Sequence, residues 1–228
     1  MKRLRDKMVR VCLLLGRRFG ESAAGIAPAG SALDILVATI LSQNASDRNS
    51  VPAFRALKRR FPKWERVLSA NEKEIARTIR GAGLANLKAR RVKHVLAEVK
   101  RRQGRLELSF LQSMPTAQAK DYLLSFKGIG PKTAAVVLNF GFGKPTMPLD
   151  VHNLRVLKRL GILRENTGAE KAHGLMDEVV PDDRKSACHV NLIRLGRRVC
   201  RPRNPKCLEC PLNAECVYFR RQFRRNRA

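Results

Sequence analysis

The chain lacks long apolar runs and carries little negative charge. No apolar run in its 228 residues approaches the roughly 18 to 20 residues that span a bilayer, which excludes an integral membrane protein. Asp and Glu total 19 against 47 Lys and Arg, so the formal net charge is +28. Hydrophobic residues make up 44%, which excludes a mainly disordered basic tail. A folded chain of this charge attracts polyanions, and nucleic acid is the first partner to consider.

The N-terminus lacks the features of a secretory signal peptide. Its apolar stretch, residues 11–15, is short, precedes Arg17 and Arg18, and has no small-residue cleavage site. Apolar residues recur there on one face of a helix, which predicts an amphipathic helix. Four of the six cysteines lie within residues 200–216, unlike the distribution in a secreted disulfide scaffold. We therefore expect a cytoplasmic protein.

Period-two alternation is also missing, and helical spacing dominates the chain. The predicted fold class is all-α with short connections. Apolar stripes predict helices around residues 33–41, 51–61, 75–79, 92–99, 134–138, 154–160 and 175–179, with a last long helix from about Asp182 to Arg198. Asn71 with Glu74 predicts a capping box, Pro131 a helix start, and Thr167 a cap.

The cysteine-rich segment has the spacing C-x6-C-x2-C-x5-C, formed by Cys200, Cys207, Cys210 and Cys216. Four thiolates this close can converge on one centre, and soft sulfur ligands select zinc or an iron–sulfur cluster. Only one CxxC is present, and the wide outer loops favour the bulkier cluster. Spacing alone does not decide between an iron–sulfur cluster and zinc. The alternative without a metal is two disulfides or free thiols.

Residues 126–133, FKGIGPKT, break the helical pattern with two glycines around one apolar residue. Glycine permits positive φ and close backbone approach, and the following helix N-terminus favours anions. Such a hairpin can hold a DNA phosphate without reading sequence, although an ordinary turn between helices has the same pattern.

Lys132 and Asp150 are candidate catalytic residues. A helix N-terminus and partial burial would both favour the neutral amine that a nucleophilic lysine needs. Asp150 lies 18 residues further on, and a carboxylate near the lysine could stabilise a developing cation or manage protons. The alternatives are a solvated lysine and a helix-capping aspartate. His152 is interpreted as structural because no second metal ligand has suitable spacing.

Together these motifs resemble the endonuclease III family of helix-hairpin-helix DNA glycosylases. The resemblance extends from about Leu33 to Cys216. It is carried by ILSQNASD at 40–47, GLANLKA at 83–89, FKGIGPKTAAVVLN at 126–139, LDVHNLRV at 149–156 and the four cysteines, whose spacing matches the family's 4Fe–4S loop.

The resemblance implies two all-α domains with a DNA-binding cleft between them. Residues 31–143 would form a six-helix barrel ending in the hairpin. Residues 1–30 and 144–228 would form the other domain, with the cluster loop at 200–216 and a basic, mobile tail at 217–228. The resemblance assigns the 4Fe–4S cluster to the four cysteines, catalysis to Lys132 and Asp150, and phosphate binding to Gly128 and Gly130.

The implied activity is that of a bifunctional DNA glycosylase and apurinic/apyrimidinic (AP) lyase. It would flip an oxidised pyrimidine out of the duplex. Lys132 would displace the base, and β-elimination through its Schiff base would cut the strand 3′ to the lesion. The implied partner is damaged double-stranded DNA, bound by a monomer associated with the nucleoid. Alternatives are a mismatch or uracil/thymine glycosylase, a non-catalytic DNA-binding iron–sulfur protein, and an electron carrier.

The expected DNA-contacting residues include departures from the family pattern. In the family, one residue of this motif fills the space that the extruded nucleotide leaves in the duplex. Asn44 stands at that position here, with Gln43 beside it. Leu84 matches a second, apolar residue that the family inserts as a wedge. Ala85 stands where a tyrosine is common, which leaves lesion preference open. Further predicted DNA contacts are Lys88, Lys127, Gly128, Ile129 and Gly130.

Three basic runs predict steeply salt-dependent DNA binding. They comprise Lys88, Arg90, Arg91 and Lys93; Arg197, Arg198, Arg201, Arg203 and Lys206; and Arg220, Arg221, Arg224, Arg225 and Arg227. Cys12 and Cys188 are expected to pack as small hydrophobes, and His189 receives no role.

Overall fold

The computed structural model describes residues 1–22 and 30–225, and the described residues contain helices and no strand. The prediction of an all-α fold is confirmed. The chain divides into two compact units. We call Ala27–Lys144 the central unit, and Met1–Ile26 with Pro145–Ala228 the terminal unit. The second boundary follows Lys144, one residue beyond the predicted one, and the first falls among residues that are not described.

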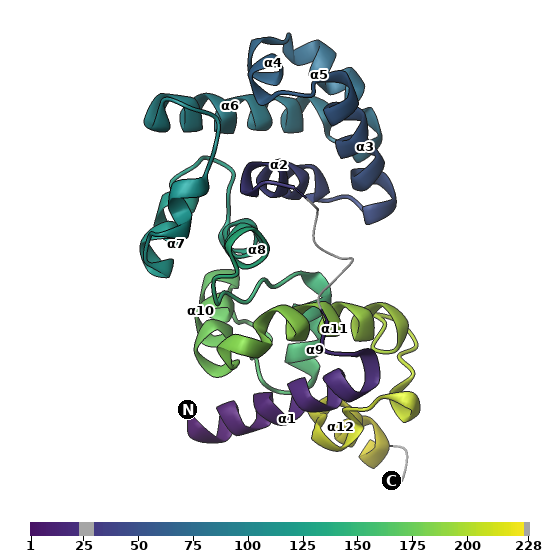
Figure 1. The fold of residues 1–228 in the computed structure, drawn as a ribbon. Coiled ribbons are helices and arrows are strands. Elements are labelled where there is room, and N and C mark those ends of the chain that lie inside the picture. The colour runs from purple at the N-terminus through teal and green to yellow at the C-terminus, as the bar shows by residue number, and fades with distance from the viewer. Residues whose placement is uncertain (23–29, 226–228) are drawn as a thin grey trace. The chain divides into compact units, whose positions relative to one another are not determined.

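The central unit is built around one almost fully buried helix, α2 (Ala32–Ser42), which packs against α3, α6 and α8. Ser31 and Asp34 form a capping box at its start, with the Asp34 amide donating to Ser31 Oγ over 3.2 Å. The other elements of the unit are α3 (Asp47–Arg60), α4 (Trp64–Ser69), α5 (Glu72–Thr78), η1 (Arg80–Ala82), α6 (Ala85–Gln103), η2 (Ser109–Gln112), α7 (Thr116–Leu124) and α8 (Pro131–Phe142) (Figure 1).

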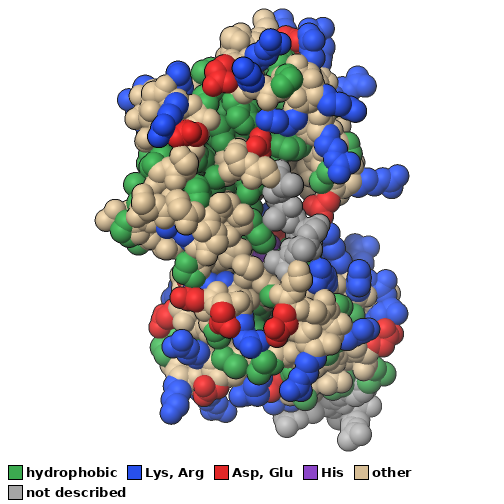
Figure 2. All heavy atoms as spheres, in the orientation of Figure 1, with side chains coloured by type: hydrophobic (Ala, Val, Ile, Leu, Met, Phe, Trp, Pro, Cys, Tyr) green, Lys and Arg blue, Asp and Glu red, His purple; other side chains and the backbone are tan. Residues whose placement is uncertain are grey.

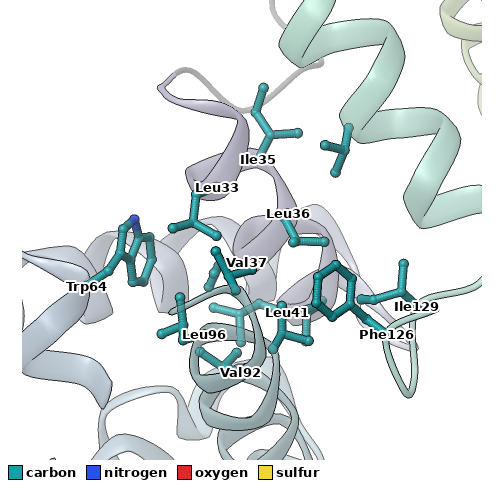
Figure 3. Close-up of a cluster of buried hydrophobic side chains, with 14 of the residues drawn as sticks. Leu33, Ile35, Leu36, Val37, Leu41, Trp64, Val92, Leu96, Phe126 and Ile129 are labelled. Atoms are coloured by element: carbon teal, nitrogen blue, oxygen red, sulfur yellow. The ribbon is translucent and has the colours of Figure 1, made fainter. Parts of the chain in front are cut away.

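Apolar side chains from these helices form one core. Figure 3 shows Leu36 and Leu41 of α2 beside Val92 and Leu96 of α6, with Phe126 reaching the same cluster. Truncating such a fully buried leucine to alanine typically costs about 2–5 kcal/mol. Because α2 and α6 are both packed into this core, the core holds in place the points where the loops of the central unit begin and end.

The terminal unit has a second core. Its elements are α1 (Lys2–Phe19), α9 (Val151–Arg159), α10 (Ala169–Val179), η3 (Asp182–Arg184), α11 (Lys185–Arg198), η4 (Cys207–Glu209), η5 (Asn213–Glu215) and α12 (Val217–Arg225). Helix α11 packs against α1 and α9. Cys12 and Cys188 lie in this core with their sulfurs 2.8 Å apart, and both are buried as expected.

Several local predictions need correction. Asn71 caps α5 through the Lys73 amide, 2.8 Å away, without the reciprocal bond from Glu74 that a capping box needs. Gly168 rather than Thr167 precedes α10, and Thr167 Oγ1 instead accepts from the Arg164 amide. The periodic analysis missed α4 and α7, whose six and nine residues are too short for a clear apolar stripe.

The C-terminal segment forms helix α12 up to Arg225, an element that the sequence analysis did not predict; the mobility expected of the tail stays a prediction. Helix α12 packs against α9, and the Arg159 guanidinium lies 4.6 Å from the centre of the Tyr218 ring. Arg227 lies outside the described residues, as do the side chains of Arg224 and Arg225. Within the described residues, no helix is both long and apolar enough to cross a membrane.

Candidate active site

The turn between α7 and α8 is anchored by its apolar residues and shaped by Gly128. Phe126 and Ile129 are buried in the central core, and the Ile129 amide donates to the Phe126 carbonyl over 3.0 Å. Gly128 has φ +87°, and a Cβ there would lie 2.9 Å from Cδ of Arg91 and closer still to its Nε. The positive φ therefore favours glycine at position 128, and any larger residue would also have to displace the Arg91 side chain.

The remaining hairpin residues differ from Gly128. Gly130 has φ −104° and open space around it, so neither conformation nor crowding demands glycine. Lys127 is exposed. Ile129 has its amide engaged in the turn and its side chain in the core, so its prediction as a DNA contact is corrected to an anchor of the hairpin.

Lys132 is the second residue of α8, directly after Gly130 and Pro131. Pro131 occupies the first helical position, where its missing N–H costs no hydrogen bond. Lys132 is half-buried, and its ammonium makes no hydrogen bond or ion pair with the described residues. The amine is thus held on a rigid element beside the hairpin and is not committed to a partner.

The loop after α2 approaches the hairpin through Gln43. The side-chain nitrogen Nε2 of Gln43 lies 3.4 Å from both the Gly128 carbonyl oxygen and Thr133 Oγ1. The Arg91 guanidinium donates to Gln43 Oε1. Gln43 therefore links the α2 end to the hairpin. Asn44 is exposed and has φ +52°, so of the two predicted gap-filling residues it is the one left facing solvent.

Leu84 is exposed to 56% and adopts a left-handed conformation with φ +48°, at the start of α6. A left-handed leucine costs roughly 1–2 kcal/mol, so the surrounding structure must hold it there. Leu87, one turn further along, is exposed to 44% and extends the apolar surface. Sequence reasoning missed Leu87, although an apolar residue three positions after the wedge was a visible signal.

Lys88 is only 2% exposed, which corrects its prediction as a DNA contact. Its ammonium donates to the carbonyls of Leu41 and Ala82, each over 2.7 Å. Burial, and secondarily the charge of Arg91, lower the pKa of Lys88. The sequence held a signal for this, because position 88 lies one helical turn before Val92 on the apolar face of α6.

The predicted basic run on α6 is accordingly not a solvated face. Lys93 donates to the Ala70 carbonyl over 2.6 Å, and Arg91 is engaged with Gln43. Of the four residues in the run, Arg90 alone is exposed. By contrast, the run beside the cysteines is exposed at Arg197, Arg198, Arg201, Arg203 and Lys206. Figure 2 shows lysine and arginine side chains spread over the drawn face of each unit, with acidic ones fewer.

Asp150, in the terminal unit, caps helix α9. Its Oδ1 accepts from the amides of His152 and Asn153, both over 2.8 Å, and its own amide donates to Asn153 Oδ1 over 3.0 Å. The capping alternative is thus correct for Oδ1. Since Oδ2 accepts no hydrogen bond from the described residues and the side chain is half-buried, one carboxylate oxygen remains available for chemistry.

Asn153 is a positioning residue that sequence reasoning missed. It is fully buried, its Nδ2 donates to the His189 carbonyl over 3.1 Å, and its Oδ1 lies 2.9 Å from His189 Nδ1. Because Oδ1 can only accept, His189 Nδ1 carries the hydrogen. Asn153 and His189 together hold the start of α9, and hence Asp150, against α11.

The stretch before Asp150 is fastened by buried polar groups. The Leu149 amide donates to Nε2 of His173 over 3.2 Å, while Nδ1 of that ring lies 2.8 Å from the Ala169 carbonyl. Asp177 accepts from the Met147 amide over 2.6 Å. The backbone leading into Asp150 therefore has fixed partners despite lacking regular secondary structure.

The four clustered cysteines line a single pocket between α9, α11 and α12. Its walls also include Val199, Tyr218 and Phe219. Arg159 organises one side: its guanidinium lies 3.4 Å from Cys200 Sγ and donates to the Arg201 carbonyl over 2.8 Å. The cysteine spacing thus produces one common site.

The four thiols place soft sulfur donors, which suit zinc or an iron–sulfur cluster, around one pocket. Within the described residues, no three His, Cys, Asp or Glu side chains converge closely enough to hold a single metal ion. The thiols nevertheless affect one another. Burial raises the pKa of Cys210 to about 11; the charges of Cys200, Cys216 and Cys207 contribute to this rise, and a hydrogen bond with the Leu212 backbone opposes it. A positively charged metal group would offset this repulsion.

The profile of the HhH-GPD superfamily of base excision DNA repair proteins matches residues 37–182, and the chain belongs to that superfamily. Endonuclease III of Thermotoga maritima is 30% identical over 188 residues, covering 82% of this chain and 84% of that protein. The Rickettsia felis enzyme is 34% identical, covering 81% and 82%. Within the superfamily, the chain is a member of the endonuclease III family, a base excision repair enzyme of the DNA glycosylase/AP lyase class.

A plant protein and a solved structure are also similar to this chain. An Arabidopsis thaliana protein, provisionally named a DNA glycosylase, is 39% identical over 155 residues, and the chain spans about half of it, 53%. A solved non-covalent complex of endonuclease III with DNA superposes with a TM-score of 0.83 over 96% of this chain and 98% of that one, at 24% identity. At that identity the superposition establishes the fold.

Proposed function

We propose that the protein is a bifunctional DNA glycosylase and AP lyase that removes oxidised pyrimidines from duplex DNA. The observation that carries the proposal is Lys132: a half-buried lysine, uncommitted to any described partner, on the first turn of the helix that follows the hairpin. A lysine held in this way is suited to act as a nucleophile once it is deprotonated.

The proposed chemistry uses the Lys132 amine twice. Nζ attacks C1′ of the extruded nucleotide, the bond from C1′ to the base breaks, and the base leaves with the electron pair and takes up a proton. The sugar ring oxygen then leaves C1′ as the Schiff base forms. Loss of a proton from C2′ expels the 3′ phosphate, and water finally releases the lysine.

We assign supporting roles to the other predicted residues. Asp150 would stabilise the cationic sugar, or move a proton, through Oδ2, the oxygen that capping leaves available. Gly128 and Gly130 would let the hairpin backbone approach a DNA phosphate, with Lys127 adding charge. Asn44 and Leu84 would fill the space vacated by the extruded nucleotide.

We further propose that Cys200, Cys207, Cys210 and Cys216 hold a 4Fe–4S cluster, because the four thiols line one pocket and their spacing resembles that of the family's cluster loop. The cluster would supply structure and DNA positioning, since base excision requires no electron transfer. The working enzyme would be a monomer on damaged double-stranded DNA in the cytoplasm, associated with the nucleoid.

The test is base release and strand cleavage on four duplexes carrying thymine glycol, an abasic site, uracil, or thymine mismatched with guanine. We expect release and cleavage on thymine glycol and cleavage of the abasic site, both abolished by Lys132→Gln. Lys127→Gln is the matched control, because it removes a neighbouring hairpin lysine and leaves the amine at position 132. Release of only uracil or mismatched thymine, without cleavage, would overturn the proposal in favour of a monofunctional glycosylase.

A further inference from the structure

A single buried lysine bonds to the ends of the two helices that directly precede the proposed gap-filling residues. The Lys88 ammonium donates to the carbonyl of Leu41, near the end of α2, and to that of Ala82, at the end of η1. Asn44 follows the first carbonyl by three residues, and Leu84 follows the second by two. Both bonds are 2.7 Å long, which is typical of charge-assisted hydrogen bonds.

The two loops share a second feature. The described residues include three non-glycine residues with positive φ, and two of them are Asn44 (φ +52°) and Leu84 (φ +48°). Such conformations persist where the surrounding structure over-determines them, and they cluster at functional sites. The same ammonium therefore bonds to both backbone segments that lead into the residues with positive φ.

The geometry points to Lys88 as a positioning residue that fixes the two wedge loops relative to each other, so that Asn44 and Leu84 enter the duplex as one unit. This inference rests on the proposed function. Lys88 touches neither DNA nor substrate, because its side chain is only 2% exposed. Arg91, one turn further along α6, engages Gln43 in the same loop as Asn44, so α6 bonds both to the end of α2 and to the loop that follows it.

A matched control lies on the same helix. Lys93 also extends from α6 and donates to a single loop carbonyl, that of Ala70 over 2.6 Å, at the junction of α4 and α5. Replacing either lysine by methionine keeps the aliphatic stem and removes the charged donor. Lys88→Met and Lys93→Met therefore differ in which loops they release.

The first measurement is single-turnover cleavage of an abasic site in two settings. In a fully paired duplex the nucleotide must be extruded, whereas in an unpaired bubble little extrusion is needed. We expect Lys88→Met to slow duplex cleavage about tenfold, or about 1.4 kcal/mol, with the bubble rate within about twofold of the parent. Lys93→Met should leave the duplex-to-bubble ratio unchanged. Equal slowing of both substrates by Lys88→Met would overturn the positioning role.

The second measurement does not depend on activity. Backbone hydrogen exchange should rise at residues 42–46 and 83–86 together in Lys88→Met, and at neither in Lys93→Met. Unchanged exchange in both loops, or a rise in only one, would refute the inference. Absence of cleavage by the parent protein would instead refute the proposed function, and hydrogen exchange would still decide whether Lys88 joins the loops.

Discussion

Replacing Gly128 by alanine should destabilise the central unit, and the structure supplies the two parts of the cost. The first is conformational: an alanine at φ +87° costs roughly 1–2 kcal/mol relative to glycine. The second is steric, because the new Cβ would press on Nε and Cδ of Arg91 and displace a guanidinium bonded to Gln43. Losing a hydrogen bond to a charged group costs about 1.5–3 kcal/mol. The expected total is about 2.5–5 kcal/mol.

Urea denaturation measures this cost against a control in the same hairpin. Gly130→Ala places a Cβ at φ −104° in open space, so the free energy of unfolding should change by less than about 1 kcal/mol. In an Arg91→Ala background the steric part should vanish, so Gly128→Ala should then cost only about 1–2 kcal/mol. Equal stabilities for the two alanine variants would refute the reasoning about Gly128.

Three further predictions concern the rest of the chain. Asn153→Ala removes the amide that fixes Asp150 and should cost about 1–3 kcal/mol in urea denaturation, with a lower cleavage rate. Hydrogen bonds with Arg101 and Arg102 lower the pKa of Glu98 to about 2. The ionised Glu98 therefore stabilises the folded protein above about pH 4.5, and this stabilisation is lost as the pH falls toward 2. In Glu98→Gln, the melting temperature should fall less steeply over that pH range. Cys210→Ser should abolish bound iron and the associated visible absorbance, whereas Cys188→Ala, which removes a thiol outside the pocket lining, should retain both.

Local sequence signals predicted much of this fold because they act over one helical turn. The apolar stripe of α2 and Pro131 at the start of α8 follow from helical spacing and from the fixed φ of proline. Asp150 as a cap likewise depends on amides two and three residues away. Such features need no knowledge of the tertiary fold.

The features that sequence reasoning missed depend on residues far apart in the chain. Lys88 reaches a carbonyl 47 residues earlier, and Asn153 reaches one 36 residues later. An argument from composition treats every basic residue as solvent-exposed. It therefore predicted that the basic run on α6 contacts DNA, whereas three of its four residues bond to other parts of the protein. The apolar periodicity of α6 was the better guide, because it places position 88 on the buried face.

The central claim is that Lys132 is the nucleophile, and one measurement tests it directly. The parent protein is incubated with an abasic duplex and borohydride, which reduces a Schiff base to a stable amine, and the trapped complex is digested for peptide mass spectrometry. The account predicts a sugar adduct on Lys132, with trapping lost in Lys132→Gln and kept in Lys127→Gln. An adduct on Lys127 or on the N-terminal amine, or trapping that survives Lys132→Gln, would contradict it.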